Sequence, residues 1–286
     1  MILATASIIV RTMTATDIDG ALPLSQAVRW PYRREDWSVA LGLGQGIVAV
    51  ADDQIVGAAL WWLYGDGFAT CGIIIVSPAM QGRGLGRMLM NHLLAANGDR
   101  SILLNSTEEG RRLYAAFGFR DIGTVHQHQA RVPADTTLTP PSDNDGRVRA
   151  AQLDDMLAIL RSDESAFGAK RTKLITEFLR IGSAAVIERD GAVQGFAICR
   201  PFGLGHAIGP VVARSTGDAR SLIRHFLHEK AGEFLRIDID GDSGLGDWLT
   251  DQGLPDVGIV TTMLRGTRPP VSGPDRIYGL ASQSFG

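Results

Sequence analysis

The sequence predicts an α/β (α+β) protein in which one domain occurs twice, each copy having a mixed central sheet flanked by helices. Three blocks carry this prediction, because each recurs in the same order along the 286 residues. GIVAVADDQIVGAALWW is echoed by AAVIERDGAVQGFAICR, and CGIIIVSPAMQGRGLGRMLMNHLL by HAIGPVVARSTGDARSLIRHFL. ILLNSTEEGRRLYAAFGFRDIGTVHQHQ is echoed by LRIDIDGDSGLGDWLTDQGLPDVGIVTTML. Three matches in one order indicate an internal duplication, with the second copy diverged.

The composition and net charge of the chain argue against several classes of function. A chain with 45% hydrophobic and 21% charged residues is typical of a soluble globular protein with ample core. The net charge of -3 argues against nucleic-acid binding, which needs a basic surface. The apolar start, MILATASIIV, has no basic flank and is too short to span a bilayer, so it predicts a first strand and no membrane anchor. Two cysteines predict free thiols and a cytoplasmic location.

Proline-rich breaks divide the chain. The stretch 133–145, PADTTLTPPSDND, lacks an apolar period and predicts a linker. The first domain is then expected at 1–132 and the second at 146–268. A second break precedes a tail at 269–286, which is apolar enough to pack back onto one of the domains.

Each element of the first copy has a local reason. Thr16 or Asp17 can cap a first helix, and a second short helix is expected to end at the glycines of ALGLG. Two apolar runs around the turn DDQ predict a hairpin, and a strand at 72–76 precedes a helix reaching about Ala96. A strand at 102–105, a short helix in GRRLYAAF and an alternating last strand in GTVHQHQARV complete the copy.

The junction SPAMQGRGLGR lacks an ordinary helix cap. Gly84 and Gly86 stand where Ser, Thr, Asp or Asn would normally bind the free backbone N–H groups. A glycine-rich turn from a strand into a helix can place these N–H groups around an anion, with the helix dipole adding attraction. The spacing is neither a P-loop nor G-x-G-x-x-G. We therefore expect a different phosphate-bearing ligand.

Gln81-x-x-Gly84-x-Gly86 resembles the pyrophosphate loop of the GNAT N-acetyltransferase superfamily. VSPAMQGRGLGRMLM matches that loop well into the helix, and STEEGRRLYAAFGF resembles the later Tyr-x-x-x-Gly-Phe motif of the family. WPYRREDW is similar to the helix–helix stretch of a GNAT subgroup with a degenerate second domain. The chain is identified as a member of this superfamily, in tandem form.

The resemblance implies acetyl-CoA as co-substrate. The pantetheine arm would pair with the end of a central strand that splays away from its parallel neighbour. The diphosphate would lie on the backbone amides that follow this strand. The cofactor-binding residues are then Ile74, Ile75, Val76, Gln81, Gly82, Arg83, Gly84, Leu85, Gly86 and Arg87.

Tyr114 matches the general-acid position of the family, and a backbone N–H at Ile75 or Val76 would contact the thioester oxygen. Glu35 is the candidate general base, with Asp36 or a water chain as alternatives. The acceptor pocket would involve Trp30, Tyr32, Asp36 and Trp62. The alternative for Tyr114 is packing alone.

The second copy carries a formal loop motif, RSTGDA, that predicts no second cofactor site. Asp218 stands where phosphates would lie and would repel them. Ser215-x-x-Asp218 has capping-box spacing, so side chains can satisfy the helix start. Leu249 or Thr250 replaces Tyr114. Phe167 and Arg171 either reach toward the first domain's pocket or support their own domain.

Two functions follow from this sequence. The first is acetyl transfer to a primary amine of a small molecule, and the second is coenzyme A binding as a sensor or scaffold without turnover. Retention of Tyr114 favours the enzyme. No metal is expected, because His126 and His128 have no further ligand cluster. A homodimer is one possible assembly.

Overall fold

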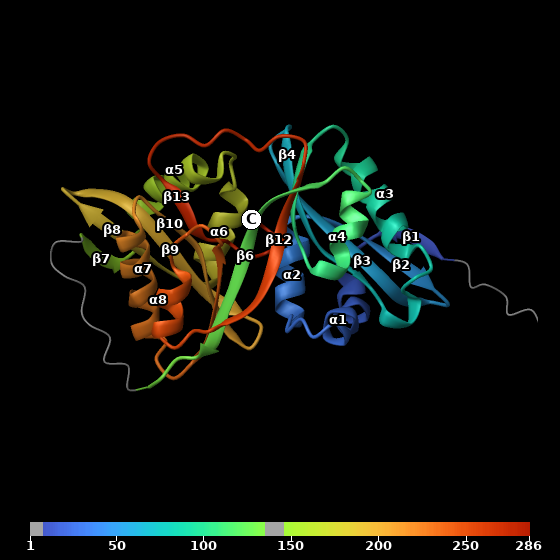
Figure 1. Cartoon of the computed structure of the whole chain (residues 1–286), viewed down its shortest axis with the longest axis horizontal. Helices are drawn as coiled ribbons and strands as arrows, with labels where there is room; N and C mark the ends of the chain where they lie inside the picture. The colour runs from blue at the N-terminus through green and yellow to red at the C-terminus, as the bar shows by residue number, and fades with distance from the viewer. Residues whose placement is uncertain (1–7, 135–145) are drawn as a thin grey trace, which may run out of the picture. The chain divides into compact units, whose positions relative to one another are not determined.

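The computed structural model describes residues 8–134 and 146–286 (Figure 1). The chain forms two compact units, Met1–Ile102 and Leu103–Gly286. Both contain strands and helices, as the sequence predicts for an α/β protein. Within the described residues, no helix combines the length and apolar character needed to cross a membrane.

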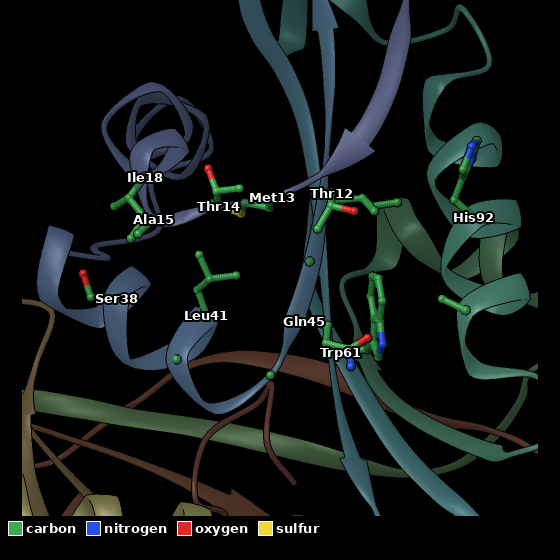
Figure 2. Close-up of a pocket in the computed structure, with 15 residues that line it drawn as sticks. Thr12, Met13, Thr14, Ala15, Ile18, Ser38, Leu41, Gln45, Trp61 and His92 are labelled. Atoms are coloured by element: carbon green, nitrogen blue, oxygen red, sulfur yellow. The ribbon is translucent and has the colours of Figure 1, made fainter.

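The first unit is an antiparallel sheet with helices on both faces. Its strands pair in chain order: β1 (Ile9–Thr12), β2 (Gln45–Ala51), β3 (Gln54–Tyr64) and β4 (Phe68–Val76). The helices are α1 (Ile18–Ala27), α2 (Arg34–Leu43) and α3 (Leu85–Asn97). Figure 2 shows α1 and α2 on one side of the strands and α3 on the other.

A bulge near the end of β4 interrupts its pairing with β3. Ala58 lies opposite Ile75 and Leu60 opposite Gly72, so two residues of β4 face one of β3. Ile73, inside the bulge, has a φ of 52°, which a β-branched residue rarely adopts. The bulge therefore bends β4 just before the glycine loop.

The second unit holds the remaining sheet, in the order β12-β6-β11-β13-β10-β9-β8-β7. Its strands are β6 (Arg120–Arg131), β7 (Arg147–Ala150), β8 (Ser183–Arg189), β9 (Ala192–Phe202), β10 (Gly205–Ala213), β11 (Phe234–Asp240), β12 (Asp256–Arg265) and β13 (Arg276–Gly279). Its helices are α4 (Glu108–Ala115), α5 (Met156–Phe167), α6 (Thr172–Ile181), α7 (Thr216–Glu229) and α8 (Gly246–Asp251). Strand β5 (Ser101–Ser106) spans the boundary between the units.

The two copies share local details as well as element order. Helices α2 and α6 end at Gly44 and Gly182, where an added Cβ would collide with the backbone carbonyl of Trp61 or Cys199. The bulge of β4 recurs in β10, where Gly209 and Pro210 interrupt the pairing with β9. These details confirm the duplication that the sequence predicts.

Strand β6 ends the first sequence copy but pairs in the sheet of the second unit. It is antiparallel to β11 and to β12, with His126 opposite both Ile239 and Ile259. The two compact units are thus defined by contacts within the folded chain, whereas the expected domain bounds 1–132 and 146–268 are drawn from the sequence repeat. These expected bounds stay a prediction. Most of the expected linker, residues 135–145, lies outside the described residues.

The tail packs back, as the sequence predicts, and it does so in the second unit. Its strand β13 joins β10 and β11, and Tyr278 and Phe285 are 4% and 5% exposed. Cys71 and Cys199 are both buried and free. Burial raises the pKa of each thiol, for Cys199 to about 12, which suits packing and not nucleophilic chemistry.

Candidate active site

The candidate site begins where β4 ends. Residues 77–84 connect β4 to α3 and include a 3₁₀ turn, Pro78–Met80. Gly84 occupies the N-cap of α3 with a φ of 82°, and no side chain caps the helix. Gly82 also has a positive φ of 74°. The uncapped helix start predicted from the sequence is confirmed.

The glycine loop is exposed and has no acidic residue, as an anion-binding site requires. Gln81, Gly82, Arg83, Gly84 and Arg87 are exposed. Leu85 is 1% exposed and anchors the first helical turn in the core. From Ser77 to Gly98 the sequence has no Asp or Glu. The start of α3 thus has an exposed N-cap glycine, no side-chain cap and no acidic side chain nearby in the sequence.

The end of β4 presents one backbone amide away from β3. Ser77 N donates to Val56 O at 2.8 Å, so the alternation of an antiparallel ladder directs the N–H of Val76 away from β3 and that of Ile75 toward it. The side chain of Gln81 donates to Val76 O at 3.3 Å. Of the two amides expected for the thioester oxygen, Val76 is therefore the one directed away from β3.

The α1–α2 connection gathers aromatic side chains. The rings of Trp30 and Tyr32 lie 6.5 Å apart, and those of Tyr32 and Trp37 lie 6.3 Å apart. Trp30 and Tyr32 are half-buried, so each keeps surface for a ligand, whereas Trp37 is fully buried. Glu35 is exposed at the start of α2.

Asp36 and Trp62 have structural partners. Asp36 accepts from the backbone N–H of Arg33 at 2.8 Å and from its guanidinium at 3.0 and 2.8 Å, which caps α2. Trp62 is 1% exposed and donates to Ala40 O at 2.9 Å. Both hold α2 in place, and their contact with an acceptor stays a prediction.

The first unit also contains a cavity of about 730 Å³ (Figure 2). None of the predicted cofactor or acceptor residues lines it. Its lining includes Thr12, Ser38, Leu41, Gln45, Trp61 and His92, which come from five different elements. The indole N–H of Trp61 is buried without a partner in the described part of the chain. No sequence motif marks this cavity, because its residues are of ordinary types and far apart in the chain.

Tyr114 lies on α4 in the second unit and is 8% exposed. Its ring packs edge-on against Phe119 at 6.1 Å. Gly110, one turn earlier, fits against the ring, because a Cβ there would lie 2.9 Å from Tyr114 Cε2. The ring is therefore packed against Phe119 and Gly110, and its apposition to the glycine loop stays a prediction.

The second copy has lost the tyrosine. Phe119 N donates to Tyr114 O, and in the same way Leu254 N donates to Leu249 O. The glycines just before these donors, Gly118 and Gly253, have φ values of 84° and 86°. Leu249 thus takes the position of Tyr114, which decides between the two residues left open by the sequence, and it is fully buried.

The second helix start is capped from within, as the sequence predicts. Ser215 Oγ accepts from Asp218 N at 3.1 Å, and Arg189 pairs with the buried Asp218 carboxylate. Only Arg214 and Ser215 connect β10 to α7. The second copy thus lacks the long loop that the first copy has.

Arg171 supports its own domain. Its side chain is fully buried and pairs with Asp163 at 2.7 Å, and its guanidinium stacks on Phe167 at 3.9 Å. Of the two roles considered for Phe167 and Arg171, the structure favours this structural one.

The two histidines have separate partners. His126 Nδ1 lies 2.7 Å from Asp256, and His128 Nδ1 lies 2.8 Å from Leu254 O. Residues 8–134 and 146–286 contain no cluster of three or more His, Cys, Asp or Glu that could hold a metal ion.

The chain is similar to known proteins in sequence and in fold. Two models described as acetyltransferase (GNAT) domain match residues 43–121 and 159–279. A putative acetyltransferase from Pyrococcus horikoshii matches with a TM-score of 0.81 at 22% identity, covering 99% of this chain and 98% of that one. A GCN5-related N-acetyltransferase from Sphaerobacter thermophilus matches at 0.61 and 17%, covering 93% and 98%.

A tandem GNAT protein from the clavulanic acid biosynthesis pathway matches with a TM-score of 0.65 at 15% identity, covering 93% of this chain and 100% of that one. A comparison with curated proteins found no match. At these identities the solved structures show the fold, and the two domain matches show the family. The chain belongs to the GNAT acetyltransferase superfamily and carries two GNAT domains in tandem.

Proposed function

We propose that the protein is an acetyl-CoA-dependent N-acetyltransferase that acetylates a primary amine of a small molecule by direct attack. We place the cofactor site at the end of β4 and in the glycine loop, and we assign no second cofactor site among the described residues. One observation carries this proposal: α3 starts at an exposed glycine with no side-chain cap, whereas α7 is capped by Ser215. The family supports acyl transfer in general.

The loop residues do the binding. The N–H groups at the start of α3 donate to the diphosphate, and Arg83 and Arg87 add positive charge. The positive φ values of Gly82 and Gly84 form the turn that exposes those N–H groups. Acetyl-CoA, when bound, supplies the acetyl thioester.

The chemistry then needs an oxyanion donor and a proton. The N–H of Val76 stabilises the negative charge that develops on the thioester oxygen. As the amine nitrogen bonds to the carbonyl carbon and the C–S bond breaks, Tyr114 Oη donates its proton to the departing thiolate. The phenolate then regains a proton from solvent, and the acetylated nitrogen gives its extra proton to solvent, which leaves a neutral amide and a free thiol.

An acceptor amine with a pKa of about 10 must lose a proton before attack. Glu35 is exposed on the first turn of α2 and can accept it, directly or through water. Asp36 is less suitable, because both of its carboxylate oxygens already bind Arg33. We therefore keep Glu35 as the candidate base.

Release of free thiol from acetyl-CoA, measured across a panel of amines, tests the proposal. The panel contains alkylamines, polyamines, amino acids and amino sugars, and amine-free reactions report hydrolysis. Amine-dependent release, with the acetylated amine seen by mass spectrometry, is expected. If acetyl-CoA binds but no amine is acetylated, the alternative applies, which is a coenzyme A sensor or scaffold.

A further inference from the structure

The two parallel strands of the second domain separate, and the chain's own tail fills the gap. Strands β10 and β11 pair from His206 opposite Leu235 to Ile208 opposite Ile237. Beyond the bulge at Gly209 and Pro210, β13 lies between them. Gly279 is opposite both Val211 of β10 and Ile239 of β11.

The tail touches both strands through its backbone. Leu280 N donates to Asp238 O of β11 at 2.8 Å. On the other side, a Cβ at Gly209 would collide with the carbonyl oxygen of Leu280. A Cβ at Gly279 would lie 3.1 Å from Val211 Cγ2. Glycine on each side thus allows the tail to approach at backbone distance.

Strand β13 lies beside β10, which corresponds to the proposed cofactor strand β4 of the first domain. Counting from the start of each nine-residue strand, Ile74, Ile75 and Val76 of β4 correspond to Val211, Val212 and Ala213 of β10. In the second domain these residues pair with the tail: Val212 is opposite Ile277, and Ala213 is opposite Arg276.

A carboxylate stands at the loop end of this strand. Asp275, just before β13, accepts from Arg214 Nε at 3.1 Å, and its side chain is 9% exposed. Arg214 begins the RSTGDA motif and corresponds to Gln81 in the glycine loop. The Asp275 carboxylate of the tail therefore binds Arg214, the first residue of the RSTGDA motif.

The far end of the tail is held in the core. The ring of Phe285 packs on Phe178 at 5.7 Å, and Arg171 Nη1 donates to Phe285 O at 3.3 Å. Tyr278 packs among the apolar side chains of β10, β11 and α7. These contacts fix the segment along its whole length.

We propose that residues 275–286 are the built-in ligand of the second domain, a peptide strand in the place where the first domain would take the pantetheine arm. The Asp275 carboxylate takes the role of the anion beside Arg214. The second domain is thus completed by its own chain and closed to acyl-CoA. This goes beyond the proposed function and holds whether or not the first domain turns over.

Hydrogen exchange of the full chain, read by mass spectrometry with and without acetyl-CoA, tests the proposal. Amides 276–280 should exchange as slowly as those of β11, and saturating acetyl-CoA should leave them unchanged. The proposal is overturned if these amides exchange like an exposed loop, or if acetyl-CoA accelerates them by displacing the tail. Neither result depends on catalysis by the first domain.

Two substitutions sharpen the test. Ile277→Pro should break the ladder and accelerate exchange of those amides within 211–213 that are directed to β13 by at least tenfold, whereas Val271→Pro, at an exposed position before β13, should not. If Ile277→Pro does not fold, Asp275→Ala removes only the ion pair and should accelerate 276–279 alone. Unchanged exchange in a folded Ile277→Pro protein would show that β13 does not hold the strands together.

Discussion

Tyr114 and Leu249 show how one residue separates two copies of the same backbone. Both lie near the end of a short helix that closes with the same hydrogen-bond pattern and a left-handed glycine. Tyr114 brings a hydroxyl, which can donate a proton, and Leu249 brings only apolar surface. The local fold therefore does not require the phenol, which supports a chemical role for it.

Tyr114→Phe should lower turnover by about 100-fold or more while leaving acetyl-CoA affinity unchanged, because only the proton donor is lost. Tyr278→Phe is the matched control, since Tyr278 is also a buried tyrosine of the second unit, at 4% exposed. It should retain full turnover. Steady-state kinetics and direct binding decide, and equal turnover in Tyr114→Phe would reduce the residue to packing.

At the scale of elements, each copy starts with the same ionic clamp. Arg11 on β1 pairs with Asp17 at 2.7 Å, and Arg149 on β7 pairs with Asp155 at 2.6 Å. Each carboxylate also caps the turn before the helix by accepting from the backbone N–H of Thr14 or Gln152. The clamp joins a strand to the following helix and is conserved between the copies.

The clamp predicts acid sensitivity. The Arg11 guanidinium lowers the pKa of Asp17 to about 2, so this stabilisation is present above pH 4 and is lost as the pH falls toward 2. Asp17→Asn should cost about 1–2 kcal/mol at pH 7, allowing for the exposure of Arg11. Urea unfolding should show the wild-type advantage shrinking below pH 4. Asp19→Asn, in an exposed pair with Arg34, should change stability by less than about 0.5 kcal/mol.

Elements with local signals could be predicted, and those set by distant pairing could not. The glycine after α2, the turn at Asp52 and Asp53 and the uncapped start of α3 are all local features, and all are observed. The placement of β13 between β10 and β11, and of β6 beside β11, depends on partners far along the chain. For the same reason the sequence named Ile75 and Val76 together, whereas pairing with β3 distinguishes them.

At the scale of the whole molecule, the duplicated fold carries one proposed site. The first copy has a long exposed loop and an uncapped helix, and the second has a two-residue connection, a capped helix and a tail strand at the corresponding place. Each difference in the second copy removes a feature to which the proposed function assigns acyl-CoA binding. The copies are therefore expected to differ in ligand number as well as in affinity.

Calorimetric titration of the full chain with acetyl-CoA should give one site. Gly84→Val should weaken binding by roughly 100-fold, since a β-branched side chain at a φ of 82° disturbs the turn, and losing two hydrogen bonds to charged phosphate costs about 3 kcal/mol. Two controls match it. Gly65→Val carries a similar strain, at a φ of 70° in the β3–β4 turn, and Gly217→Val changes the same motif position in the second copy. Both should keep one site of wild-type affinity. Two equivalent sites in the wild type, or full affinity in Gly84→Val, would contradict the assignment of the cofactor to the first domain alone.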